Sequence, residues 1–273
     1  HGLEESLMGG QSFSWSVLGD NHWGGAIGDI RVDLRWMEGL VEWRSFGDSF
    51  VDKTYLTNYL WMDPSYGQAI DSLPWRSDPV LLQAMKAFPG LRILRQPMDE
   101  TLFVFLLSSA KSIPQIQAIG DAVFQRYGDQ LIEDMYSFPG WAKLAEIPEE
   151  DLRLLKMGYR AKYISQSAKF INDQPGWLES IPQMKYVDAK NELLKLPGVG
   201  AKIADCALLF GGNFLEAFPI DTWIEKSLEK RYSLEGWSTS QKTHFARIHF
   251  GKFAGLAQQF LFSAERLGIL DKH

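Results

Sequence analysis

A turn of sequence Pro-Gly-Val-Gly at residues 197–200 constrains the fold more than any other feature, because sequence typical of a helix stands on both sides of it. Leucines at helical spacing precede the turn, and a proline followed by a glycine ends that helix. A second helix is expected to start at about Ala201. We therefore predict a helix-hairpin-helix unit at about residues 188–210.

The turn offers a way to hold a phosphate without charged side chains. Gly198 and Gly200 allow positive φ and close approach of another backbone. The amides from Val199 to Lys202 then lie at the positive end of the second helix, where they can face a phosphate. The same pattern also occurs as an ordinary turn between helices, so on its own it fits a structural role as well as DNA binding. Together with Pro197, these turn residues are candidates for contacting DNA.

Composition excludes several classes of protein. With 273 residues and 45% apolar side chains, the chain can bury a substantial core, and we expect two or three subdomains. No apolar run reaches the roughly 18 residues that span a bilayer, so no membrane partner is expected. One cysteine excludes a disulfide framework and a four-cysteine metal site. No cofactor or metal is expected, since useful ligand spacing is absent among the histidines His1, His22, His244, His249 and His273.

Charge is distributed unevenly along the chain, whose formal net charge is −6. Residues 1–60 carry four basic and nine acidic side chains, a local balance of −5. Residues 153–202 carry nine basic and four acidic side chains, a local balance of +5. A charged stripe is usually a solvated helix face. Next to the hairpin, however, the basic stretch indicates a DNA-binding face.

Sequence patterning divides the chain into a β-rich first part and a helical second part. Strands are predicted over residues 13–17, 24–27, 30–36, 39–43 and 49–51. Helices are predicted over residues 58–62, 80–88, 101–109, 114–127, 141–145, 149–157, 161–172, 187–195, 201–210, 222–232 and 239–262. We therefore expect an α+β fold, with an N-terminal antiparallel β-sheet domain at 1–96 packed on an all-helical body at 97–273.

Short motifs outside the hairpin carry a resemblance to a known family. They are GQSFSW at 10–15, LRQ at 94–96, Ser108-Ser109, GYRAKY at 158–163, ADC at 204–206 and LFSA at 261–264. In this order, with a turn of the form LPGVGxK and a later aspartate, they resemble the 8-oxoguanine DNA glycosylases of the helix-hairpin-helix superfamily. The resemblance covers nearly the whole chain. It implies a monomer whose partner is double-stranded DNA containing oxidised guanine, with the base held between helical subdomains.

The resemblance assigns the chemistry to a lysine and an aspartate. Base excision requires flipping the damaged nucleotide and then attack at the sugar C1′. Lys202 would be the amine nucleophile that displaces the base, forms a Schiff base and permits strand nicking by β-elimination. Asp221 is expected to N-cap the helix at 222–232, to have a low pKa, and to stabilise the cationic sugar or orient Lys202. Solvation of the lysine and simple capping by the aspartate are the ordinary explanations.

Four further residues are expected in a base pocket. Cys206 lies one helical turn after Lys202, and the resemblance places it beside the lysine. Gly10 would offer a carbonyl to the N7 hydrogen that oxidised guanine has and guanine lacks, a discrimination on the order of 1–3 kcal/mol. Gln258 and Phe262 would supply a base-edge amide and a stacking ring. The ordinary structural explanations are that Cys206 and Phe262 pack in the core and that Gly10 forms a turn.

Two residues after a glycine are expected to contact the duplex. The resemblance implies that Tyr159 wedges the duplex and that Arg160 contacts the base opposite the lesion. A packed tyrosine and an arginine bound to a phosphate are the structural explanations for the same residues. Their position beside the basic stretch favours a DNA contact.

The chain departs from the eukaryotic pattern of this family at three places. An asparagine-rich run is replaced by Ala110, Lys111 and Ser112, an arginine by Gln115, and a histidine by Trp223. The Ala110 side chain cannot reach or hydrogen-bond a base. Lys111 is a candidate for the missing intercalating side chain, and a solvated lysine is the alternative. We therefore expect weaker discrimination among the bases opposite the lesion.

Two other functions remain open. A monofunctional glycosylase for alkylated bases on the same scaffold would not need Lys202. A non-catalytic helix-hairpin-helix module would need neither Lys202 nor Asp221, and salt-sensitive binding without lesion preference would favour it. The chain begins at His1, which indicates removal of an N-terminal segment. The expected compartment is the cytoplasm or nucleoid of a prokaryote, or the nucleus of a eukaryote.

Overall fold

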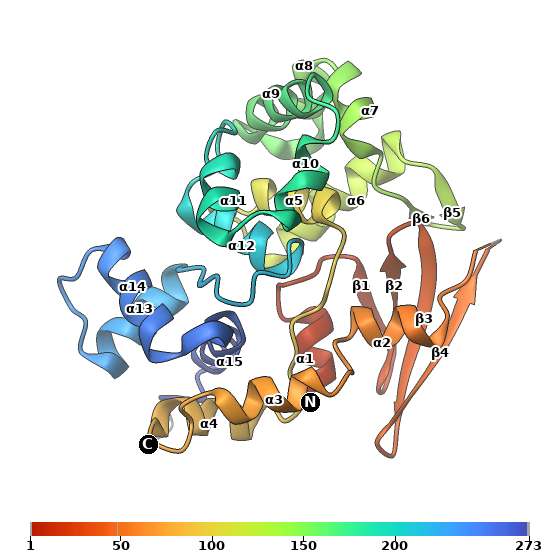
Figure 1. The fold of residues 1–273 in the computed structure, drawn as a ribbon. Helices are drawn as coiled ribbons and strands as arrows, with labels where there is room; N and C mark the ends of the chain where they lie inside the picture. The colour runs from red at the N-terminus through yellow and green to blue at the C-terminus, as the bar shows by residue number, and fades with distance from the viewer. Residues whose placement is uncertain (1, 48, 272–273) are drawn as a thin grey trace.

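The computed structural model describes residues 2–47 and 49–271, and it places an antiparallel sheet beside a larger helical body (Figure 1). The sheet has the strand order β1-β2-β3-β4, and each strand is antiparallel to the next. The strands are β1 (Trp15–Gly19), β2 (His22–Ile27), β3 (Ile30–Met37) and β4 (Leu40–Phe46). The predicted α+β class with an N-terminal antiparallel sheet is confirmed.

One face of the sheet forms a core of its own. Trp23 of β2 and Leu34 of β3 lie opposite each other, and both are buried. Two helices cover this face, α1 (Gly2–Met8) and α2 (Lys53–Tyr59). Their side chains Leu7 and Tyr59 join the same core, where Trp15 Nε1 donates to the Tyr59 hydroxyl over 2.9 Å. The sheet is therefore held by burial on one side.

The strand predicted over residues 49–51 is wrong. Side chains rather than a backbone ladder hold this segment beside β4. Trp43 Nε1 donates to the Val51 carbonyl over 2.8 Å, and the Val51 amide donates to Ser45 Oγ over 2.9 Å. The helix predicted over 58–62 is also wrong, because α2 ends at Tyr59 and Trp61 has a φ of +48°.

Two further helices follow α2 in the chain, α3 (Ser65–Ser72) and α4 (Pro79–Ala87). Their buried residues Ala69 and Leu81 belong to the larger core, that of the helical body. The boundary at residue 96 therefore stays a prediction, since two short helices before it share the later core. Asp78 N-caps α4 and also accepts from the Tyr232 hydroxyl over 2.9 Å, which ties α4 to the C-terminal helices.

The helical body is built around α5, which is buried at every position from Thr101 to Leu107. Its helices are α5 (Met98–Leu107), α6 (Ile113–Tyr127), α7 (Gly140–Glu146), α8 (Glu149–Leu152), α9 (Arg160–Asn172), α10 (Trp177–Ser180), α11 (Tyr186–Leu193), α12 (Ala201–Phe210), α13 (Thr222–Tyr232), α14 (Thr239–His249) and α15 (Ala254–Arg266). Shorter elements are the 3-10 turns at Ile181–Gln183 and Gly251–Phe253 and the segment Arg153–Met157. This segment is kinked where Lys156 has a φ of +62°, so the helix predicted over 149–157 is interrupted. The body is not all-helical, because a two-stranded hairpin of β5 (Gln130–Ile132) and β6 (Met135–Tyr136) interrupts it.

The single long helix predicted over residues 239–262 is wrong. Helix α14 ends at His249, and Gly251 has a φ of +69°, a left-handed conformation that ends a helix. The chain then turns into α15, whose Gly255 lies against α12. A Cβ on Gly255 would lie 2.3 Å from Leu209 Cδ1 and 2.8 Å from the Ala217 carbonyl oxygen, so a larger residue would require the backbone to shift. The break brings α15 back onto the body (Figure 1).

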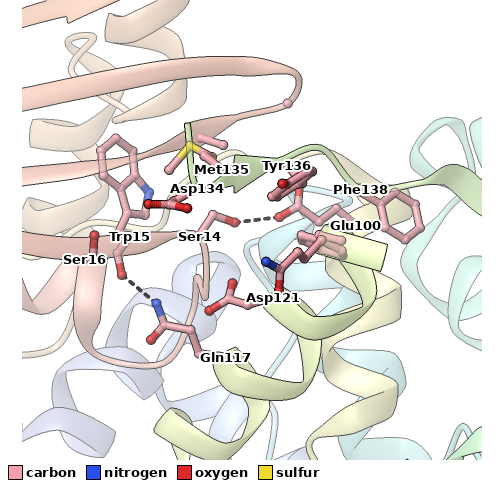
Figure 2. A pocket seen from close by; sticks show the side chains of 14 residues that line it. Ser14, Trp15, Ser16, Glu100, Gln117, Asp121, Asp134, Met135, Tyr136 and Phe138 are labelled. Carbon is pink, nitrogen blue, oxygen red and sulfur yellow. Dashed lines mark hydrogen bonds between the residues drawn. The ribbon is translucent and has the colours of Figure 1, made fainter. Parts of the chain in front are cut away.

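A cavity of about 260 Å³ lies where the sheet meets α5, α6 and the β5–β6 hairpin (Figure 2). Gln117 Nε2 donates to the Trp15 carbonyl over 3.0 Å, which ties α6 to β1. Ser14 Oγ donates to Glu100 Oε1 over 2.6 Å. Burial raises the pKa of Glu100 to about 7 and that of Asp121 to about 6. The junction between sheet and body thus contains carboxyl groups that resist ionisation.

We expect Glu100→Gln to change how stability depends on pH. Because the folded pKa of about 7 lies above the ordinary 4.5, the stabilisation from Glu100 is complete below pH 4.5 and is lost as the pH rises through 7. This shift corresponds to a loss of at most about 3 kcal/mol of unfolding free energy, and an amide should avoid it. Urea unfolding at pH 5 and pH 8 measures the difference. Glu150→Gln, at an exposed glutamate, is the control; equal pH slopes in Glu100→Gln and the unaltered chain would contradict this account.

Candidate active site

A cavity of about 740 Å³ opens between the N-terminal segment, the end of α5 and helices α12, α13 and α15. Five of the predicted site residues line it, namely Gly10, Lys111, Lys202, Asp221 and Phe262. These residues come from widely separated parts of the chain. The fold therefore brings these five predicted site residues together in one cavity.

Lys202 lies in the first turn of α12 and reaches the wall of the cavity. Its Nζ donates to Ser108 Oγ over 3.0 Å and lies 5.4 Å from the ring centroid of Phe105. Ser108 Oγ in turn donates to the Phe105 carbonyl over 2.7 Å. The end of α5 thus holds the lysine by a hydroxyl acceptor and an aromatic face.

Asp221 is the N-cap of α13, as the sequence predicts. Its Oδ1 accepts from the amides of Trp223 over 3.1 Å and Ile224 over 2.9 Å. The expected low pKa is wrong, because burial raises the pKa of Asp221 although the two amides and Lys202 act to lower it. Among the residues that the structure describes, no ion pair within 4 Å joins Asp221 to Lys202. The carboxylate is fixed by the helix rather than by the lysine.

Cys206 and Gln258 are buried and are not among the residues that line the cavity. Burial raises the pKa of the Cys206 thiol to about 12, although Lys202 acts to lower it. Gln258 Nε2 donates to the Pro219 carbonyl over 3.1 Å, and its Oε1 accepts from Gln259 Nε2 over 2.9 Å. Both ends of the Gln258 amide are therefore engaged within the protein. The Nε2 end holds the segment that precedes Asp221.

Gly10 and Phe262 lie next to each other at the cavity. Gly10 has a φ of +98°, and a Cβ there would lie 2.7 Å from Ile113 Cδ1 and 4.0 Å from Phe262 Cε1. The following Gln11 fixes this segment, because its Nε2 donates to the Arg92 carbonyl over 2.7 Å. A side chain at position 10 would therefore be both strained and obstructed.

The hairpin turn has one left-handed glycine, not two. Gly198 has a φ of +81°, and a Cβ there would lie 2.4 Å from Tyr163 Cδ2. Gly200 is extended, with a φ of −99°, so it does not use the positive φ that glycine allows. The Val199 amide donates to the Leu196 carbonyl over 3.1 Å. The amides that begin α12 have no acceptor within the helix, so they are the ones free to face a phosphate.

A buried charge pair joins the two helices of the hairpin. Lys190 Nζ of α11 donates to Asp205 Oδ2 of α12 over 2.7 Å, and the Tyr186 hydroxyl donates to Asp205 Oδ1 over 2.7 Å. Burial raises the pKa of Asp205, while Lys190 and Tyr186 act to lower it. The guanidinium of Arg247 lies 4.4 Å from the Tyr186 ring centroid. Sequence reasoning missed this pair, because no local pattern indicates which lysine of α11 faces α12.

Tyr159 and Arg160 differ in exposure. Tyr159 is 50% exposed, and its ring meets Tyr163 edge-on at 5.8 Å, next to the hairpin turn. The Arg160 guanidinium lies 4.4 Å from the Tyr159 ring centroid but is buried, with Nη1 3.4 Å from the Met157 carbonyl. Tyr159 is therefore placed to meet a ligand, whereas contact by Arg160 requires another side-chain conformation.

Four of the five substituted positions line the cavity, and Gln115 does not. Ala110 has a φ of +52° and lines the cavity together with Lys111 and Trp223. Gln115 is not in the lining; its Oε1 accepts from the Ser112 amide over 3.0 Å and so caps α6. The predicted DNA contact of Gln115 stays a prediction beside this local role.

The structure adds a cavity residue that sequence reasoning missed. Arg266 lines the cavity one turn after Phe262, and its guanidinium lies 5.7 Å from the Phe262 ring centroid. Arg266 Nη2 also donates to Glu5 Oε1 of α1 over 2.6 Å. The spacing of four residues from Phe262 is the only signal of this contact in the sequence.

Within residues 2–47 and 49–271, the protein has neither a clustered metal-ligand set nor a membrane-spanning helix. Within these ranges, no group of three or more His, Cys, Asp or Glu side chains is placed to hold a metal ion. None of the helices in the same ranges is both long and apolar enough to cross a membrane. His1 and His273, included among the histidines without useful spacing, lie outside the described residues.

Two families match the chain in succession. The 8-oxoguanine DNA glycosylase N-terminal domain matches residues 2–102, and the HhH-GPD superfamily of base excision DNA repair proteins matches residues 105–248. The chain is 30% identical over 285 residues to the N-glycosylase/DNA lyase OGG1 of Arabidopsis thaliana, covering 94% of this chain and 75% of that protein. It is 38% identical over 123 residues to a probable N-glycosylase/DNA lyase of Methanothermobacter thermautotrophicus, covering 45% of this chain and 39% of that protein.

Solved structures share the whole architecture. The 8-oxoguanine glycosylase/lyase of Clostridium acetobutylicum, solved with double-stranded DNA containing cytosine opposite 8-oxoG, has a TM-score of 0.90 and 29% identity. The match covers 97% of this chain and 92% of that chain. The 3-methyladenine DNA glycosylase of Archaeoglobus fulgidus has a TM-score of 0.74 at 18% identity, over 92% of this chain and 90% of that one. The second likeness concerns the fold alone.

We expect Lys190→Met to destabilise the protein by about 3 kcal/mol or more, because it leaves the buried Asp205 carboxylate without its charged partner. Lys195→Met is the matched control. It breaks a pair with Glu192 of similar length, 2.6 Å, but its lysine is exposed, so we expect a change below about 1 kcal/mol. Chemical unfolding at pH 7 measures both variants. Equal effects would contradict the role assigned to Asp205.

Proposed function

Because the chain belongs to the 8-oxoguanine DNA glycosylases of the HhH-GPD superfamily, we propose that it excises 8-oxoguanine from duplex DNA and then nicks the strand at the abasic site. The observation that carries the proposal is the position of Lys202 Nζ. It lies at the wall of a cavity of about 740 Å³, in the first turn of the second hairpin helix, and Asp221 lines the same cavity. This volume is in the range of small-molecule sites and suits a flipped nucleotide.

Lys202 is the proposed nucleophile. The lone pair of neutral Nζ forms a bond to C1′, and the bond from C1′ to the base nitrogen breaks, with its electron pair leaving on the base. The nitrogen then loses a proton, and its lone pair forms the C1′=N bond as the C1′–O4′ bond breaks. O4′ takes up a proton, which leaves a ring-opened, protonated Schiff base. Removal of a C2′ proton expels the 3′ phosphate by β-elimination, which nicks the strand. The lysine amine thus accounts for both activities.

Asp221 is the proposed electrostatic partner. Its carboxylate is fixed by two amides of α13, so it need not reorganise when positive charge develops on the sugar. Burial raises the pKa of Asp221, while the amides of α13 and Lys202 act to lower it and so favour the ionised form that this role requires. Within the described part of the chain, Lys202 forms no ion pair with Asp221 at 4 Å or less. Its amine therefore remains available for attack.

The proposed base pocket uses a carbonyl and a ring. Gly10 would accept the N7 hydrogen of the oxidised base, and the neighbouring Phe262 ring would stack on it. Cys206 would form the wall behind Lys202 as an uncharged thiol. Gln258 would read the base edge only after exchanging one of its internal hydrogen bonds. Of these four residues, Gln258 is the one that would have to change its hydrogen bonds before it could contact the base.

Duplex DNA is the proposed partner of the hairpin face, bound by a single copy of the chain. The amides that begin α12, after Gly200, would hold a backbone phosphate. Exposed Tyr159, next to Tyr163 and the turn, would wedge the duplex, and Lys111 would reach into the vacated stack. Pro197 and Gly198 would shape the turn by which this face approaches the duplex. Arg160 would join the contact on leaving its buried position.

Borohydride trapping tests the lysine. We expect a covalent adduct between the chain and a duplex carrying 8-oxoguanine, and we expect Lys202→Gln to abolish it. Lys195→Gln, which alters an exposed lysine on the same hairpin, should still form the adduct. Base release by the unaltered chain without an adduct would indicate a monofunctional glycosylase. Binding with neither signal would indicate a DNA-binding module.

The opposite base should matter less than in a cytosine-strict enzyme. Ala110 has no group that can hydrogen-bond an estranged cytosine, and Gln115 caps α6. We expect single-turnover excision opposite C, A, G and T to differ by less than about a thousandfold, a span of about 4 kcal/mol. Rate constants on four matched duplexes measure this span. A larger preference for cytosine would show that another residue reads it.

A further inference from the structure

We infer that Ser108 is a positioning residue for Lys202, an acceptor that directs the lone pair of the amine into the cavity. The inference rests on the proposed function, because it assigns a direction to the nucleophile that the proposal names. Ser108 belongs to α5, and Lys202 lies 94 positions later in α12. Their contact therefore exists only in the folded chain.

The proton of the Ser108 hydroxyl is already committed. Ser108 is the C-cap of α5, and both its amide and its Oγ donate to the Phe105 carbonyl, over 3.0 Å and 2.7 Å. The side chain is almost completely buried, at 9% exposed. A hydroxyl has one proton and two lone pairs. Toward Lys202, Ser108 can therefore only accept.

This polarity decides which part of the amine faces the cavity. A neutral amine has one lone pair and two hydrogens. A hydroxyl that donated to Lys202 would occupy the lone pair and block attack on C1′. With its proton held by Phe105, Ser108 instead accepts an N–H over 3.0 Å, and the lone pair is turned away from Ser108. By accepting the Ser108 proton, the Phe105 carbonyl keeps that proton away from the lone pair of Lys202.

The same contact serves later steps. After attack, the nitrogen still carries hydrogen, and so does the protonated Schiff base. Ser108 can accept from each of these species without rearranging its own proton. The Phe105 ring, 5.4 Å from Nζ, adds a favourable face for the positive charge. Loss of the Ser108 acceptor should therefore slow base excision and also slow imine formation on a DNA that is already abasic.

The experiment compares Ser108→Ala with Ser108→Thr and Ser180→Ala. Threonine keeps the hydroxyl. Ser180 is a matched control, because its Oγ also donates to the carbonyl three residues earlier, that of Trp177 over 2.6 Å, and it does not line the cavity. Excision is measured under single-turnover conditions with enzyme above saturation, and borohydride trapping is measured on an abasic duplex. Affinity is measured by anisotropy on a duplex with a tetrahydrofuran site. Thermal melting checks that each variant folds.

We expect Ser108→Ala to reduce both the excision rate and the trapping rate by about 10- to 100-fold, the scale of a small misplacement of a reacting group. Affinity for the tetrahydrofuran duplex should stay within about twofold, and Ser108→Thr should recover most of the rate. Ser180→Ala should resemble the unaltered chain. If Ser108→Ala melts below the assay temperature, Ser108→Cys, a weaker acceptor of similar shape, carries the same expectation.

Unchanged rates in Ser108→Ala, with a normal adduct from the unaltered chain, would overturn the inference and leave the proposed function intact. A rate loss matched by an equal loss of affinity would also overturn it, since Ser108 would then act in binding. No adduct from the unaltered chain would overturn both the inference and the proposed function of Lys202.

Discussion

Two short helices can present a lysine and a row of free amides at one end of a hairpin only while their relative orientation is fixed. The buried pair of Lys190 and Asp205 fixes it, because neither charge can leave the other without an uncompensated charge in the core. Tyr186 satisfies the second carboxylate oxygen of Asp205. The turn, the start of α12 and the reach of Lys202 toward α5 all depend on that orientation.

Local patterns in the sequence predicted the elements that local chemistry determines. Helices α12 and α13 have the predicted bounds, because a Pro-Gly turn precedes one and an aspartate cap precedes the other. The four strands follow from apolar runs broken by glycine. The pKa of Asp221 was predicted wrongly because its amide bonds are local, whereas its burial depends on helices distant in the sequence. The same limit hid the contact between Ser108 and Lys202.

The break at Gly251 shows how one residue can change a site without lying in it. A continuous helix from 239 onward would carry Phe262 away from the cavity. The left-handed glycine instead ends α14, and close packing at Gly255 directs α15 along α12. Phe262 and Arg266 then meet the N-terminal segment at Gly10 and Glu5. Helical periodicity continues through such a break, so the sequence pattern alone did not reveal it.

The burial of Cys206 has a consequence for survival under oxidising conditions. Peroxides attack the thiolate rather than the thiol, and burial raises the pKa of Cys206 to about 12, so the thiol stays protonated at neutral pH. A more exposed cysteine beside a lysine would form thiolate more readily and would then be a target for conversion to sulfenic acid. The same packing that keeps Cys206 out of the cavity therefore also protects its sulfur from oxidation.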